Sequence, residues 1–134
     1  RVRVALVDHG SPTREVTRVR DRLAAQLRRR LGPIVAACSM ERRPGAAYAF
    51  NEPLLENLLA SKPWRSGPVV VAQLFLLPGR HAGPGGDIAA ICRRVKARRP
   101  RLRIARTALL GDHPGLIDLL ADRYRSIGGG GLQD

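Results

Sequence analysis

The three histidines of the chain are the side chains best suited to chemistry at neutral pH. His9, His81 and His113 each follow a stretch that is expected to form a β-strand, and the carboxylate Glu41 follows another. Neutral imidazole binds divalent transition metals and accepts protons, and two imidazoles with one carboxylate form a partial ligand shell. The residue types therefore predict a site that holds a divalent metal and moves protons.

The spacing of these residues leaves other interpretations open. The chain has no His-x-x-x-His or Glu-x-x-His pair, so no local metal motif supports the prediction. His9 could hold a turn together, His81 could be an exposed loop residue, and His113 could sit at a helix start. Glu41 could pair with a neighbouring arginine on the surface. The metal site depends on whether the fold brings these residues together.

Apolar stretches alternate with amphipathic ones four times, and this alternation predicts the fold class. It gives a three-layer α/β fold, with a four-stranded parallel sheet in the order 2-1-3-4 and helices on both faces. The expected strands span residues 2–7, 34–38, 69–77 and 102–108, and the expected helices span residues 16–31, 53–61, 88–95 and 114–124. We expect a single domain over residues 1–127 and a flexible Gly-rich tail over residues 128–134.

The apolar positions also predict which side chains face the core. The first helix would turn inward Val16, Val19, Leu23, Leu27 and Leu31, and the last helix Leu116, Ile117, Leu120 and Tyr124. The strand at residues 69–77 shows no alternation, so we expect both of its faces to be buried.

The carboxyl ends of parallel strands are where such folds bind ligands. The loops at these ends span residues 8–12, 39–51, 76–87 and 111–114, and they contain all three histidines. We therefore expect at least two of the histidines on one rim of the sheet. A Gly-Pro-Gly-Gly run at residues 83–86 could hold an anion through backbone amides, although it matches neither common nucleotide-binding fingerprint.

The net charge of the 134-residue chain is strongly positive. It has 24 Lys and Arg, of which 22 are Arg, against 11 Asp and Glu, for a formal charge of +13. A preference for Arg codons in a GC-rich genome would explain this, as would a polyanionic partner. Arg pairs bidentately with carboxylates, so a small substrate with many carboxylates fits. A nucleic-acid-binding module is not expected, because only 4% of residues are aromatic.

Composition narrows the protein class. The chain is 44% hydrophobic and 26% charged, an ordinary globular balance, and no apolar run approaches the ~20 residues of a membrane helix. Cys38 and Cys92 are too few for a disulfide framework, so we expect a reducing, cytoplasmic compartment. We expect no signal peptide, because the chain opens directly with a stretch that is expected to form a strand. It begins with Arg1 and not Met, so we expect a trimmed form or a domain of a longer chain.

Several segments together resemble one family. They are the strand and His-Gly-Ser of residues 4–12, Met40-Glu41, the run Leu-Phe-Leu-Leu-Pro-Gly-Arg-His at residues 74–81, Asp87-Ile88, and residues 110–114. They resemble the class II tetrapyrrole chelatases, and among these the small sirohydrochlorin cobaltochelatases and ferrochelatases. The resemblance runs over nearly the whole chain, and residues 75–81 are its most specific part.

The resemblance implies an enzyme that inserts a divalent metal into sirohydrochlorin or a related tetrapyrrole, in cobalamin or siroheme biosynthesis. The metal would be Co²⁺ or Fe²⁺, with Ni²⁺ as a third possibility. It implies a homodimer and no nucleotide. The expected catalytic and metal-binding residues are His9, His81 and Glu41. The expected substrate-binding residues are Ser11, Arg42, Arg43, Leu76, Leu77, Pro78, Gly79, Arg80 and His113.

The chain also departs from the family pattern. Asp8 stands where a Gly often precedes the histidine, the loop after Glu41 is longer than usual, and five residues rather than about three separate His81 from Asp87. A non-catalytic metal or tetrapyrrole carrier on the same fold is one alternative. A histidine phosphatase is another, although Asp8 would repel phosphate where those enzymes carry Arg.

Overall fold

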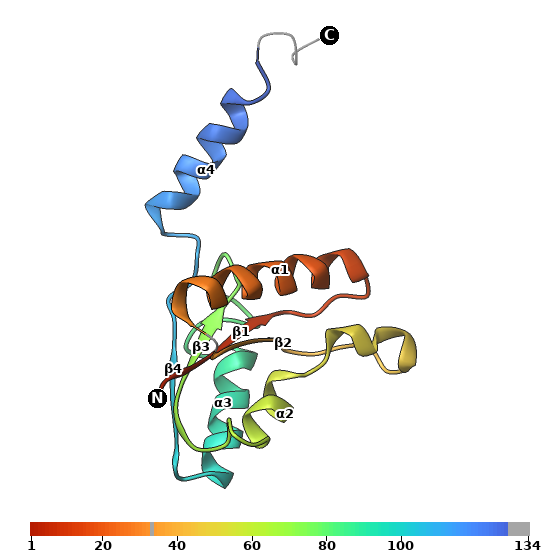
Figure 1. Ribbon diagram of the computed structural model, residues 1–134, viewed down its shortest axis with the longest axis vertical. Helices are drawn as coiled ribbons and strands as arrows, with labels where there is room; N and C mark the ends of the chain where they lie inside the picture. The colour runs from red at the N-terminus through yellow and green to blue at the C-terminus, as the bar shows by residue number, and fades with distance from the viewer. Residues whose placement is uncertain (33, 129–134) are drawn as a thin grey trace.

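A four-stranded parallel sheet organises the computed structural model, which describes residues 1–32 and 34–128 (Figure 1). Its order is β2-β1-β3-β4, which confirms the predicted topology. The strands are β1 (Arg3–Asp8), β2 (Val35–Ser39), β3 (Gly67–Gln73) and β4 (Leu102–Arg106). In the register of the central strands, Val7 lies beside Cys38 of β2 and Gln73 of β3. The loops that follow β1, β2 and β3 therefore begin at the same edge.

Helices cover the two faces of this sheet unequally. Figure 1 shows α1 on one face and α2 and α3 on the other, while α4 extends away from the sheet. The helices are α1 (Arg14–Leu31), α2 (Leu55–Ala60), α3 (Asp87–Arg98) and α4 (Pro114–Arg125), with a 3₁₀ helix, η1 (Ala46–Asn51), inside the predicted loop of residues 39–51. None of the helices within the described ranges combines the length and apolar character that crossing a membrane requires.

The side chains of β1 alternate between the two faces of the sheet and so contribute to two separate cores. Ala5 and Val7 point to the α2 and α3 side, where they join a large buried cluster. Val4 and Leu6 point to the other side, where the buried cluster is small and includes Ala24 of α1. The sheet is therefore well packed on one face and only partly packed on the other.

The expected strand ends differ from the observed ones by a few residues. β3 stops at Gln73 and not at residue 77, and β4 stops at Arg106 and not at residue 108. Past these points the segments that follow β3 and β4 remain hydrogen-bonded to each other. The carbonyls of Phe75 and Leu76 accept from the amides of Leu110 and Gly111. Leu74 and Phe75 still pack against the cores, whereas Leu76 and Leu77 are exposed, so the apolar run continues beyond the strand. β2 begins and ends one residue later than the expected strand at residues 34–38.

The predicted inward face of α1 was partly wrong. Val16, Val19 and Leu31 are about half exposed, and the buried positions of the helix are Thr17, Arg20 and Ala24. Only Leu23 and Leu27 of the expected set pack against the core. The first turns of α1 face polar groups of η1 and β2, so the residues turned inward there are hydrogen-bonding ones.

The predicted burial of α4 was wrong. No residue of α4 is buried, and Ile117, Leu120 and Tyr124 are 66%, 57% and 72% exposed. Because α4 does not pack on the sheet, Val70 and Ala72 of β3 are only half-buried. The expected strand at residues 69–77 was predicted to be buried on both faces. Of the predicted tail at residues 128–134, only Gly128 belongs to the described residues, and it is exposed.

Candidate active site

His9 and His81 come together at the carboxyl edge of the sheet. His9 follows β1 and His81 lies in the loop after the neighbouring strand β3. Their ring centroids are 4.4 Å apart and the rings are tilted by 59°. The prediction that two histidines share one rim is confirmed, and residues far apart in the sequence thus form one imidazole pair.

Glu41 joins this pair through His9. Its Oε1 lies 3.1 Å from His9 Nε2, and both side chains are about half exposed. The other ring nitrogen, Nδ1, lies 2.9 Å from the carbonyl oxygen of Gly10. Both nitrogens of His9 therefore face oxygens that act as acceptors. A neutral imidazole has one N–H and can donate to only one of these oxygens, whereas a doubly protonated ring can donate to both.

The turn at Gly10 explains why His9 and Glu41 meet. The amides of Met40 and Glu41 donate to the carbonyls of Asp8 and His9, which draws the loop after β2 against the loop after β1. Gly10 has a φ of 94°, and a Cβ at this position would collide with the carbonyl oxygen of Glu41. Only glycine fits here without moving the backbone of Glu41.

His81 has a different carboxylate partner, Asp87, which the sequence analysis did not include among the site residues. His81 Nδ1 lies 2.8 Å from Asp87 Oδ2. Asp87 is the first residue of α3, and its amide and that of Ile88 donate to the carbonyls of Arg80 and His81. A carboxylate on Nδ1 fixes the tautomer, so Nε2 of His81 is left to accept a proton or bind a metal.

A buried network of hydrogen bonds holds the loop after β1, which carries His9. Asp8 Oδ1 accepts from the amide of Gly10 at 3.1 Å and from the hydroxyl of Ser39 at 2.6 Å. Ser39 Oγ and the carbonyl of Asn51 accept from the Arg20 guanidinium at 2.8 and 2.7 Å. Arg20 and Asp8 are both buried and are linked through Ser39. The Arg20 guanidinium also pairs with Asp21, whose Oδ1 lies 2.9 Å from Arg20 Nη2.

Ser11 is held in the same network by its backbone. Its amide donates to Asn51 Oδ1 at 3.0 Å, and its carbonyl accepts from Asn51 Nδ2 at 2.9 Å. The Ser11 hydroxyl accepts from the amide of Thr13 and so helps to start α1. Sequence reasoning missed Arg20 and Asn51, because a helical arginine and a loop asparagine are usually exposed.

A comparison with models of protein families identifies the family of the chain. The model of the CbiX family matches residues 3–127 of the chain. The chain belongs to the CbiX family. This is a family of sirohydrochlorin cobaltochelatase-like proteins, in agreement with the resemblance carried by the sequence motifs.

A solved structure supports the fold of this CbiX-family chain. It is the 1.60 Å crystal structure of a CbiX protein from Marinobacter aquaeolei VT8, named for cobalamin (vitamin B12) biosynthesis. The two are 22% identical with a TM-score of 0.69, and the match covers 94% of this chain and 93% of the other. No curated protein matches the chain significantly.

The predicted arginines of this CbiX-family site lie beside the histidine pair. Arg42 and Arg43 line a cavity of about 400 Å³ together with His9 and Glu41. Arg42 donates to the carbonyl of Gly45 at 3.3 Å, and Arg43 stacks its guanidinium 5.8 Å from the ring centroid of Tyr48. The loop after Glu41 thus brings two arginines to this cavity, and Nε of Arg42 lies 3.9 Å from Glu52 Oε1.

The predicted macrocycle segment forms an exposed shelf next to His81. Leu76 and Leu77 are 56% and 68% exposed, and the Pro78, Gly79 and Arg80 that follow are also exposed. Adjacent exposed leucines of this kind usually mark a surface that another molecule covers. The shelf and His81 lie in the same loop, which joins β3 to α3, and His9 reaches this place from the loop after β1.

His113 lies at the start of a helix, which is one of the two positions that the sequence analysis left open for it. Its Nδ1 accepts from the amide of Gly115 at 2.9 Å, so it caps the N-terminus of α4. Its expected part in substrate binding stays a prediction.

No group of three or more His, Cys, Asp or Glu side chains converges on one point in the part of the chain that the structure describes. The histidines and carboxylates instead form two linked pairs. The two cysteines are buried. Burial raises the pKa of the Cys38 thiol to about 12, and it also raises the pKa of the Cys92 thiol above its ordinary value. Both thiols are therefore protonated at neutral pH and are poor metal ligands.

Proposed function

We propose that this protein inserts a divalent metal into sirohydrochlorin or a closely related tetrapyrrole, with no nucleotide, as a step of cobalamin or siroheme biosynthesis. Co²⁺ and Fe²⁺ are the expected metals, with Ni²⁺ as the third candidate. The observation that carries the proposal is the pair of imidazoles 4.4 Å apart, each against its own carboxylate, in a chain of the CbiX family.

The chemistry of metallation matches what these groups can do. Two pyrrole N–H protons must leave while the metal ion arrives, so the site needs lone pairs for the ion and bases for the protons. His81 offers Nε2 because Asp87 occupies its Nδ1. His9 Nε2 adjoins Glu41, which is exposed to solvent and can pass a proton to water. His9, His81 and Glu41 are therefore the proposed catalytic and metal-handling residues.

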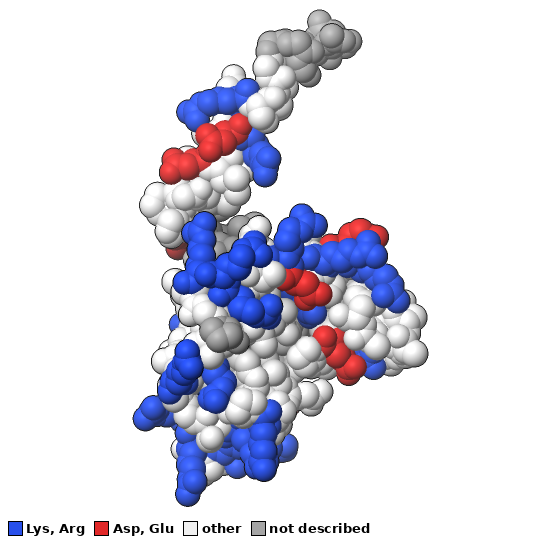
Figure 2. Space-filling model, viewed as in Figure 1, with Lys and Arg blue, Asp and Glu red and all other residues white. Residues whose placement is uncertain are grey.

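The charge of the molecule supports a substrate rich in carboxylates. Figure 2 shows Lys and Arg side chains over α1 and around the end of α3, with only scattered Asp and Glu. Arg42 and Arg43 line the cavity beside His9, and Arg80 is an exposed residue next to His81. We infer that these arginines pair with carboxylates on the macrocycle rim and that the exposed Leu76 and Leu77 contact its flat apolar face.

A metallation assay tests this proposal. Purified protein is mixed without oxygen with sirohydrochlorin and, separately, with Co²⁺, Fe²⁺ or Ni²⁺, and the visible spectrum of the macrocycle is followed against a protein-free control. We expect many turnovers per chain with at least one of Co²⁺ and Fe²⁺. A carrier would instead bind one equivalent of metal or macrocycle with no rate above the control, and that result would overturn the proposal.

A further inference from the structure

Four arginines gather at the amino edge of the sheet, which is opposite the edge that carries His9 and His81. They line a hollow of about 420 Å³ in front of the starts of β3 and β4. The residues around this hollow are Arg65, Ser66, Arg98, Arg99, Pro100 and Arg101. We call its four arginines the basic patch.

The backbone holds the basic patch together. β3 and β4 are parallel, so the segments that enter them, residues 61–66 and 99–101, lie side by side at one edge. The amide of Gly67 donates to the carbonyl of Arg101 at 2.9 Å and ties the two segments to each other. Arginines that are far apart in the sequence are therefore neighbours because the sheet places them so.

The basic patch has no counter-charge of its own. None of its four guanidinium groups forms an ion pair within residues 1–32 and 34–128. The C-terminus of α3 carries a partial negative charge that favours Arg98, but Arg65 and Arg101 belong to other segments. Like charges around one hollow repel each other, and an anion bound there would relieve this repulsion.

The distribution of acidic residues makes this end of the molecule basic. Residues 57–111 contain 11 Lys and Arg and a single acidic residue, Asp87, whereas residues 1–56 contain 11 Lys and Arg and six acidic residues. Asp87 begins α3 and pairs with His81, and Arg98 ends the same helix about 17 Å away at 1.5 Å per residue. Codon preference explains arginines, but it does not remove Asp and Glu from one stretch of the chain.

The space-filling view agrees with this distribution. Figure 2 shows Lys and Arg side chains around the end of α3, at the bottom of the view, with no Asp or Glu among them on the visible face. The neighbouring Lys62, Lys96 and Arg103 are also exposed. The cations thus extend past the hollow and outnumber those that one small anion can pair with.

The other residues of the hollow indicate which polyanion fits. Binding of single-stranded nucleic acid uses aromatic platforms, and Trp64, the one aromatic residue of these segments, packs against the core. Binding at a membrane surface uses inserted apolar side chains, and none of the large exposed hydrophobic residues belongs to residues 61–66 or 98–101. Carboxylates need neither, because they pair bidentately with guanidinium groups.

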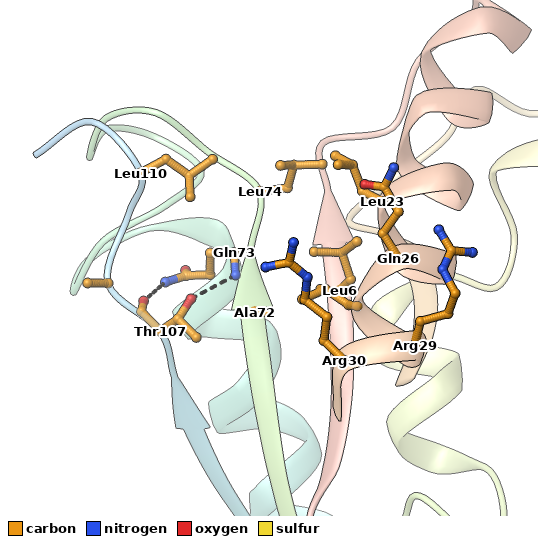
Figure 3. Close-up of a pocket in the computed structure, with 12 residues that line it drawn as sticks. Leu6, Leu23, Gln26, Arg29, Arg30, Ala72, Gln73, Leu74, Thr107 and Leu110 are labelled. Carbon is orange, nitrogen blue, oxygen red and sulfur yellow. Dashed lines mark hydrogen bonds between the residues drawn. The ribbon is translucent and has the colours of Figure 1, made fainter. Parts of the chain in front are cut away.

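The largest cavity of the described residues has a different character. It has a volume of about 890 Å³ between α1 and β3, and its lining is mainly apolar (Figure 3). Arg29 and Arg30 of α1 contribute to it among leucines, and α1 also carries Glu15 and Asp21. The arginines of α1 therefore serve as a comparison of equal charge on a surface of mixed composition.

We propose that the basic patch is a docking surface for an acidic segment of a partner protein, rich in Asp or Glu. The seven residues of β3 separate the two edges of the sheet by about 23 Å at 3.3 Å per residue. A partner bound at the amino edge therefore leaves His9 and His81 open to substrate. The proposal rests on the charge and placement of the patch and does not depend on the proposed reaction.

Fluorescence anisotropy of a labelled oligoglutamate peptide at low ionic strength tests the docking surface. The patch variant Arg65→Gln/Arg98→Gln/Arg101→Gln removes three of the four charges that line the hollow. We expect its Kd for the peptide to rise about tenfold, because each exposed charge pair contributes modestly and the three contributions add. These side chains are exposed or half-buried, so circular dichroism should show an intact fold.

The matched control removes the same number of charges from α1. Arg18→Gln/Arg22→Gln/Arg29→Gln changes exposed residues, so both variants have the same net charge. We expect the Kd of the control variant to rise by no more than about twofold, since the lost charges are distant from the hollow. Equal Kd values for the two variants would show that the peptide responds to net charge alone, and that result would overturn the proposal.

Three further probes decide the class of the partner. They are oligothymidine, phosphatidylserine vesicles and inorganic tripolyphosphate, and each is bound to both triple variants. For every probe, the Kd of the patch variant is divided by the Kd of the control variant. We expect the largest ratio for oligoglutamate. A larger ratio for the DNA, the vesicles or tripolyphosphate would assign the patch to nucleic acid, a membrane or a small anion, and would overturn the proposal.

Discussion

The two histidines of the site are held in different ways, and this difference assigns them different tasks. His81 is oriented by Asp87 at 2.8 Å and keeps Nε2 available. His9 contacts both Glu41 and the carbonyl of Gly10, so its two nitrogens already have acceptors. We infer that His81 makes the first contact with the metal ion and that His9 and Glu41 receive protons.

Asp87→Ala tests the orientation of His81. Loss of the carboxylate frees the ring and its tautomer, so we expect metallation to slow by roughly 10- to 100-fold. The rate should remain above that of His81→Ala, since the imidazole itself is still present. Asp112→Ala, on the fourth loop, is a control that should leave the rate unchanged. A wild-type rate for folded Asp87→Ala would contradict the role given to this carboxylate.

Cys38 should impose its own pH dependence on stability. The thiol ionises near 9.0 when unfolded, and burial raises the pKa in the folded state to about 12. The unfolded chain therefore loses this proton first as the pH rises. The free energy of unfolding should be insensitive to Cys38 below about pH 9 and should fall between pH 9 and 12.

Urea unfolding of the native sequence and of Cys38→Ala at several values between pH 8 and 11 measures this effect. The stability of Cys38→Ala should fall less steeply with pH, after allowance for the cavity that the smaller side chain leaves. Parallel curves for the two proteins would show that the thiol is not shielded from water.

Among the elements, α1 matters most for the geometry of the site, through a residue that looks like a surface arginine. Arg20 is 3% exposed and donates to Ser39 and to the carbonyl of Asn51, and Ser39 in turn donates to Asp8. Removing the guanidinium leaves the buried carbonyl of Asn51 and Ser39 Oγ without the donor that they share. α1 therefore fixes the loop that carries His9.

Arg20→Ala should lower the free energy of unfolding by about 2–3 kcal/mol, the range for a lost hydrogen bond to a charged group with a buried partner left behind. Arg18→Ala is the matched control, because Arg18 is exposed and its pairing with Glu15 at 3.7 Å contributes about 1 kcal/mol at most. Urea unfolding measures both. Equal effects of the two substitutions would mean that the buried network does not stabilise the fold.

The elements also show where sequence patterns succeed and where they fail. The strand order and the meeting of His9 with His81 were predictable, because strand–helix alternation fixes which loops share an edge. Asp87 was not predictable as a partner of His81, because the contact depends on how residues 82–86 fold back so that the amide of Asp87 reaches Arg80. Periodicity identifies an apolar stripe, and nothing in it says which surface the stripe will meet, so the burial of α4 was predicted wrongly.

At the scale of the whole molecule, the charge of +13 should affect how the substrate arrives. A macrocycle with many carboxylates is attracted by a strongly basic surface, and salt screens that attraction within about 10 Å at 0.1 M. We therefore expect kcat/KM for the macrocycle to fall as ionic strength rises, while kcat changes little. Stopped-flow mixing at several NaCl concentrations measures this. A kcat/KM independent of salt would favour codon preference as the source of the arginines.

The central claim is that His9 and His81 together perform metallation, and the double variant His9→Ala/His81→Ala tests it most directly. Both residues lie in loops at strand ends, so their truncation should leave the fold intact by circular dichroism. The account predicts that the folded double variant metallates sirohydrochlorin no faster than the protein-free control, while His113→Ala retains most of the activity. A folded double variant that works at the wild-type rate would contradict the account.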